Sequence, residues 1–102
     1  MSYGSRGGRP YTCRFSVKAG GTDYPLPVRS AELVIRPQSG SARLYWHERD
    51  YLADPQGDSD TADGYVILNR DQYAGEFRLR ASVDRLYLRG DAELEVTVLS
   101  QG

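Results

Sequence analysis

The chain has 102 residues, which is enough for one domain with a buried core and too few for two. A net charge of -1, with 39% apolar and 26% charged residues, excludes a fully disordered protein and does not favour nucleic acid as a partner. The longest apolar runs span four residues, far below the roughly 20 of a membrane-spanning helix, and residues 1–10 lack the apolar core of a secretory signal. We therefore expect neither a membrane segment nor secretion.

Residues 1–10 contain three glycines, a proline, two arginines and no acidic residue. Such a segment cannot bury a core of its own, so we expect an extended N-terminal arm followed by one domain over residues 11–102. We predict that Tyr3, Arg6, Arg9 and Tyr11, in or beside the arm, contact a protein partner.

Residues 11–18 alternate between apolar and polar side chains, which predicts a half-buried strand. Cys13 lies on its apolar face and is interpreted as a small buried hydrophobe; as the single cysteine, it cannot form an intramolecular disulfide. Residues 23–28 are also extended, but two prolines place them at a sheet edge or in a loop.

Two hairpins are predicted further along the chain. The first joins strands 31–36 and 43–47 through residues 37–42, and pairs Ile35 with Leu44, Leu33 with Trp46 and Glu32 with His47. The second joins strands 85–89 and 93–98 through Gly90, Asp91 and Ala92. It pairs Leu88 with Leu94, Leu86 with Val96 and Arg89 with Glu93.

Two more strands are predicted between these hairpins, over residues 65–68 and 76–81, and no segment has helical periodicity over ten or more residues. About seven short strands separated by frequent turn residues are typical of an all-β protein. We expect a single antiparallel β-sandwich or jelly roll.

Residues suited to catalysis are few. His47 is the single histidine, and it lies on the outward side of its predicted strand while Cys13 lies on the inward side of its own. A Cys–His nucleophile is therefore not expected, and the sequence favours a protein that is not an enzyme and needs no cofactor.

Six carboxylates lie between Glu48 and Asp63, against one basic residue. Asp58, Asp60 and Asp63, followed by Gly64, are candidates for a calcium loop, because this cation prefers clustered oxygen ligands. However, Ala62 stands where the EF-hand pattern needs a third ligand, and Asn69 stands where it needs a glutamate. The sequence therefore favours a solvated acidic loop without metal.

The chain contains eight tyrosines, a residue enriched at protein interfaces. Tyr3 and Tyr11 lie near the arm, and Tyr45 and Tyr87 fall on outward-facing strand positions. We predict that these four contribute to an interface; the alternative is that they only favour strand formation.

The sequence from Ala31 to Ser100 resembles small virion proteins of tailed bacteriophages, including head decoration or cement proteins. The strings that carry the resemblance are Ala31-Glu32-Leu33-Val34-Ile35, Gln38-Ser39-Gly40-Ser41, Leu44-Tyr45-Trp46, Asp63-Gly64-Tyr65-Val66-Ile67-Leu68 and Leu86-Tyr87-Leu88-Arg89-Gly90-Asp91. The acidic segment from Glu48 to Asp63 departs from this pattern, which leaves the position within the particle open.

This resemblance implies a structural subunit that forms oligomers and binds the major capsid protein or other virion proteins, without nucleic acid or membrane. It would be assembled in the host cytoplasm and located in the virion. Two alternatives remain open: a phage tail or fibre attachment subunit, and a carbohydrate-binding module in which Trp46, Tyr45 and the acidic loop contact a saccharide.

Overall fold

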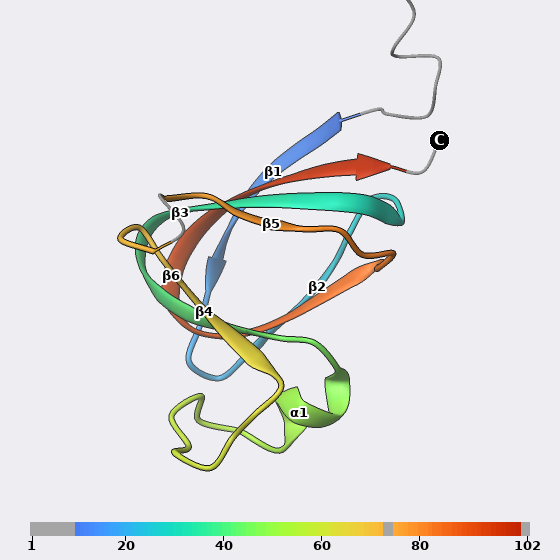
Figure 1. Cartoon of the computed structure of the whole chain (residues 1–102). Coiled ribbons are helices and arrows are strands. Elements are labelled where there is room, and N and C mark those ends of the chain that lie inside the picture. The colour runs from blue at the N-terminus through green and yellow to red at the C-terminus, as the bar shows by residue number, and fades with distance from the viewer. Residues whose placement is uncertain (1–9, 73–74, 101–102) are drawn as a thin grey trace, which may run out of the picture.

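The computed structural model describes residues 10–72 and 75–100. Their strands form one antiparallel sheet of six (Figure 1). The elements, in chain order, are β1 (Pro10–Val17), β2 (Thr22–Pro25), β3 (Ser30–Tyr45), α1 (Glu48–Leu52), β4 (Tyr65–Asn69), β5 (Phe77–Leu79) and β6 (Arg85–Ser100). The all-β prediction is confirmed. The sandwich or jelly roll is not, because the strands belong to one continuous sheet.

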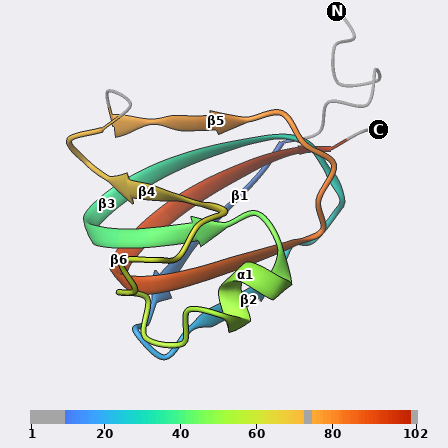
Figure 2. The ribbon, with the colours of Figure 1, turned by 60° about the horizontal axis from the view of Figure 1, so that its bottom comes forward.

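The sheet is organised around β3 and β6, two strands of 16 residues that pair from Ser30 opposite Ser100 to Tyr45 opposite Tyr87. Both bend sharply, so the sheet folds over onto itself (Figures 1 and 2). An upper layer contains β5, the first half of β3, the second half of β6, and β1. A lower layer contains β4, the second half of β3, the first half of β6, and β2.

The apolar core lies between these layers. It includes Leu33 and Ile35 from the first half of β3, Leu44 from its second half, and Leu88 and Val96 from the two halves of β6. Because large apolar residues recur at every second position before and after the bend, both halves of each long strand can face the same interior.

The two predicted hairpins are wrong. Residues 37–42 lie inside β3 and residues 90–92 lie inside β6, where the two segments pair with each other. Ile35 is opposite Val96, Leu44 opposite Leu88 and Leu33 opposite Val98, so neither predicted set of partners forms. The remaining strand predictions are confirmed with small shifts in their boundaries.

Glycines at the bend explain why turn-like sequences lie within strands. Gly40 has φ 76° and is opposite Ala92, while Gly90 has φ 145° and is opposite Ala42. A Cβ atom on Gly40 would overlap the carbonyl oxygen of Asp91, and one on Gly90 would meet that of Ser41. A register shift between Pro37 and Ser39 adds a bulge, which accommodates a proline and increases strand curvature.

The segment between β3 and β4 contains α1, a helix of five residues that was not predicted. This segment and the helix lie below the lower layer (Figure 1). Among the described residues, no helix has the length and apolar character required to cross a membrane.

Candidate protein-interaction site

β1 is an edge strand that begins at Pro10, the last residue of the predicted arm, and among the described residues it pairs only with β6. The side chains on its outer face are held by β6: Thr12 contacts the Thr97 hydroxyl at 3.1 Å, and Arg14 donates two hydrogen bonds to Glu95. Ser16 donates to Glu93. Polar cross-strand pairs of this kind fix the register of β1 on the sheet.

The inner face of β1 becomes steadily more exposed toward its first residue. Val17 is buried and Phe15 is half-buried, with its ring stacked on Tyr24 of β2 at 4.0 Å between centroids. Cys13 packs against the core beside Val96, but it is half-buried and not fully buried as predicted. Tyr11 is 37% exposed, one of four large apolar side chains exposed in the described part of the chain. Within the described part of the chain, the start of β1 therefore offers both a strand edge without a partner and an exposed aromatic ring.

The other predicted interface residues have different surroundings. Tyr3, Arg6 and Arg9 lie outside the described residues. Tyr45 points away from the core as predicted, but it is only 2% exposed because the segment after β3 covers it. Tyr45 is therefore not available for the interface predicted for it. Tyr87 is half-buried, with its ring centroid 5.4 Å from that of Tyr51 in α1.

Asp54 lies at the centre of a polar cluster beneath the lower layer, contrary to the expectation that the whole acidic loop is solvated. It is 1% exposed and accepts hydrogen bonds from the Tyr45 hydroxyl at 2.6 Å, Arg43 at 2.7 Å and the Ser59 amide at 3.1 Å. Burial opposes its ionisation, but these donors outweigh burial and lower its pKa. Burial, followed by the hydrogen bond to Asp54 and then by the negative charge of Asp54, raises the pKa of Tyr45.

Arg43 and Arg89 attach the same segment to the sheet. Arg43 also donates to the Ser59 carbonyl oxygen at 3.1 Å, and its guanidinium lies over the Tyr65 ring. Arg89 is buried; it donates to the carbonyl oxygens of Tyr51 and Gly20 and stacks on the Tyr51 ring. Arg89 was predicted to pair with Glu93 in a hairpin, and that pairing is absent because both residues lie in one strand. The sequence did not predict this polar cluster around Asp54 and Arg89, because its members lie on separate elements that only the fold brings together.

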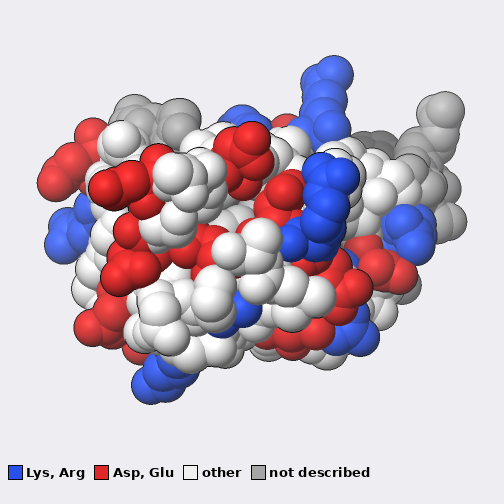
Figure 3. Space-filling view, turned by 90° about the horizontal axis from the view of Figure 1, so that it is seen from below, with Lys and Arg blue, Asp and Glu red and all other residues white. Residues whose placement is uncertain are grey.

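Acidic side chains are numerous on the lower face, with a few basic ones among them (Figure 3). Glu48, Asp58, Asp60 and Asp63 are exposed there. However, nowhere among residues 10–72 and 75–100 do three or more Asp, Glu, His or Cys side chains form a group able to hold a metal ion. The calcium hypothesis for Asp58, Asp60 and Asp63 is therefore not supported. The segment presents its carboxylates at the surface except at Asp54, which is buried, and Asp50, which is half-buried.

Charged side chains on the outer face of the upper layer form a ladder that crosses β1, β6, β3 and β5. Successive N–O distances along it are 3.0, 3.6, 3.0, 2.7 and 3.6 Å. The ladder runs through Arg14, Glu95, Arg36, Glu76, Arg78 and Glu32. Because the opposite charges neutralise one another, this face stabilises the sheet without presenting a field of one sign.

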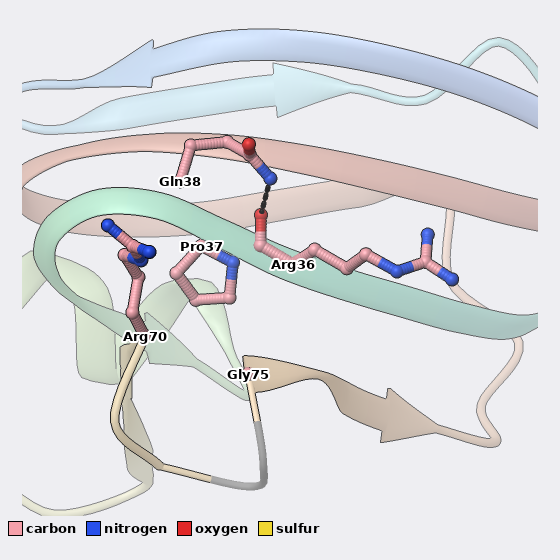
Figure 4. A pocket seen from close by; sticks show the side chains of 5 residues that line it. All are labelled: Arg36, Pro37, Gln38, Arg70 and Gly75. Atoms are coloured by element: carbon pink, nitrogen blue, oxygen red, sulfur yellow. Dashed lines mark hydrogen bonds between the residues drawn. The ribbon is translucent and has the colours of Figure 1, made fainter.

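A hollow of about 480 Å³ lies at the bend of β3, lined by Arg36, Pro37, Gln38, Arg70 and Gly75 (Figure 4). Its polar groups do not converge on one point. Arg36 extends along the strand away from the hollow, toward its carboxylate partners in the ladder, and Gln38 donates to the Arg36 carbonyl oxygen at 3.1 Å. Arg70 reaches the hollow from the end of β4. We therefore place no catalytic constellation here.

His47, the residue before α1, is exposed, whereas Cys13 is half-buried within β1. Comparison of the sequence with models of protein families and with curated proteins gives no match. What defines this protein is therefore its own geometry: an antiparallel β protein in which β1 is an edge that no other described strand covers, and in which the charged side chains of the upper layer form a ladder of ion pairs.

Proposed function

We propose that this protein is a non-enzymatic structural subunit of a bacteriophage particle, a decoration or cement protein that binds and stabilises neighbouring capsid proteins. One observation carries the proposal. β1, the longest edge strand among the described residues, continues directly from the predicted arm of residues 1–10. An open strand edge binds proteins through its backbone, by adding a further strand.

The arrangement of charge supports a structural role. Asp54, the buried carboxylate of the described chain, is engaged by three donors that keep it ionised, and a carboxylate with a lowered pKa is a poor proton acceptor. The ladder on the upper layer likewise uses its carboxylates to bind arginines. The hydrogen bonds of Asp54 therefore attach the segment between β3 and β4 to the sheet, and the ion pairs of the ladder connect neighbouring strands of the upper layer.

The resemblance to virion proteins also contributes to the proposal, through strings that lie in β3, β4 and β6 and in the residues beside them. A decoration protein acts in many copies on a symmetric shell. A modest affinity per contact is then sufficient, because each attached copy raises the effective concentration of the remaining contacts.

The proposal is tested by mixing the purified full chain with empty capsids of the phage that encodes it and sedimenting the mixture. We expect the chain to sediment with the capsids, and a variant lacking residues 1–9 to bind at least tenfold more weakly. Asp58→Asn, in the exposed acidic loop, is the matched control and should bind like the unmodified chain. Sedimentation with purified tails alone would support the tail or fibre alternative, and binding to neither particle would overturn the proposal.

A second function is favoured by one observation. Trp46 is 41% exposed, as expected of a ring that stacks on a saccharide, although its predicted companion Tyr45 is buried. Titrating the chain with oligosaccharides while recording Trp46 fluorescence tests this carbohydrate-binding alternative. Saturable quenching, together with binding measured by calorimetry that Trp46→Ala abolishes, would support it over capsid binding.

A further inference from the structure

The edge strands of the described sheet differ in how well they are protected against pairing with another chain. β5 has three residues, β2 has four and ends in Pro25, and β4 has five. β1 has eight residues, and its single proline, Pro10, occupies the first position. Proteins usually protect an edge with short strands, prolines or inward-pointing charges. From Tyr11 to Val17, β1 has none of these.

We propose that two copies of this chain pair through β1, with the strands antiparallel and the two-fold axis at Cys13. This inference rests on the proposed function and refines it: the open edge accepts a second copy of the chain, and the resulting dimer is the unit that binds the capsid. An isologous contact of this kind needs one self-complementary patch, which a single strand edge provides. The two upper layers would then join into one continuous sheet.

The register follows from side-chain direction and charge. In a continuous sheet, residues directly opposite each other must point to the same face, so the axis has to pass through a residue of β1. An axis at Cys13 or at Arg14 pairs seven of the eight residues, and any other axis pairs fewer. The axis at Arg14 would place two guanidinium groups directly opposite each other, which is unfavourable. The axis at Cys13 avoids this repulsion.

This register also gives complementary neighbours. Tyr11 of each copy lies opposite the partner's Phe15, so two aromatic pairs form on the inner face and cover rings that are partly exposed in the single chain. Arg14 lies opposite the partner's Thr12 and keeps its hydrogen bonds to Glu95. Its charge is therefore balanced within its own chain.

Disulfide trapping of the full chain tests the register. Opposite residues in an antiparallel pair have Cα atoms about 4.5 to 5.5 Å apart, within the range that a disulfide spans. Diamide takes up the two protons and two electrons released when the paired thiols are oxidised. We expect it to convert the unmodified chain to a covalent dimer within minutes, and Cys13→Ser to give no covalent dimer.

Three variants in the Cys13→Ser background serve as matched controls. Thr12→Cys combined with Arg14→Cys should form the dimer, because these positions face each other across the axis. Ser16→Cys, which faces the partner's Pro10, should not. Ile67→Cys, at the centre of β4, should not either, and a dimer trapped there would show that β4 is the paired edge and overturn the proposal.

Sedimentation equilibrium tests the charge argument without any crosslink. Thr12→Arg places two pairs of like charges across the proposed contact and should weaken dimerisation about fivefold. Thr61→Arg adds the same charge on an exposed loop residue and should leave it unchanged. A chain that stays monomeric at all concentrations and yields no Cys13 disulfide overturns self-pairing. If such a chain still sediments with capsids, the proposed function stands and the edge binds another protein.

Discussion

Asp54 attaches the segment between β3 and β4 to the sheet through hydrogen bonds from β3 and from its own loop. Replacement by alanine would leave Arg43 with its charge largely buried and the Tyr45 hydroxyl without its acceptor. We expect Asp54→Ala to lower the free energy of unfolding by about 3 kcal/mol, measured by urea denaturation. Asp58→Ala, at an exposed position of the same loop, should change it by less than about 0.5 kcal/mol.

The lowered pKa of Asp54 also predicts how stability depends on pH. Since this pKa is lower in the folded than in the unfolded state, Asp54 stabilises the fold at pH values above the unfolded pKa of about 3.9. That stability is lost as the pH falls through the folded pKa. Urea denaturation between pH 6 and pH 2 should show a larger loss on acidification for the unmodified chain than for Asp54→Asn. Equal losses would contradict the role given to Asp54.

At the scale of elements, the bend of β3 and β6 depends on two residues without side chains. Gly40→Ala and Gly90→Ala would each force a Cβ atom against the backbone of the paired strand at a positive φ. We expect each substitution to lower the free energy of unfolding by about 2 to 4 kcal/mol, seen as a lower midpoint in thermal or urea denaturation. Gly20→Ala is the control, because its Cβ atom would meet nothing within 4 Å and stability should hardly change.

The core residues could be predicted from the sequence, whereas the pairing of strands around these two glycines could not. Alternation identified Leu33, Leu44 and Val96 as core residues, since a residue's face depends only on the local strand pattern. The hairpins were wrong because a hairpin loop and a sharply bent strand need the same residues. Glycine and small side chains suit both, and only the pairing of residues 37–42 with 90–92, far apart in sequence, separates them.

The candidate site could be predicted in part. The place of Tyr11 on the apolar face of a strand follows from alternation, whereas the edge position of β1 depends on which strands pair and does not. The burial of Tyr45 and Asp54 does not, because it results from a loop folding across the sheet. Hydrogen bonds between side chains on β3 and a loop nine residues later leave no periodic pattern in the sequence.

At the scale of the whole molecule, the protection of backbone amides against hydrogen exchange should depend on where each strand lies in the sheet. β3 and β6 have strands paired on both sides, whereas β1, β2, β4 and β5 each pair on one side among the described residues. In amide hydrogen exchange of the dilute chain, we expect the slowest amides in β3 and β6. If β1 exchanges as slowly as β6 only at high protein concentration, self-pairing at β1 is the direct explanation.

The course of β3 and β6 through both layers has a consequence for how the chain can be altered. Because β3 and β6 each contribute one half to the upper layer and the other half to the lower layer, the protein cannot be divided into two halves that fold separately. A foreign peptide inserted between residues 30 and 45 would break the pairing in both layers at once. Insertion beside Asp60, on the lower face, would interrupt no strand. Under the proposed role in a particle, it would display the peptide once for every attached copy.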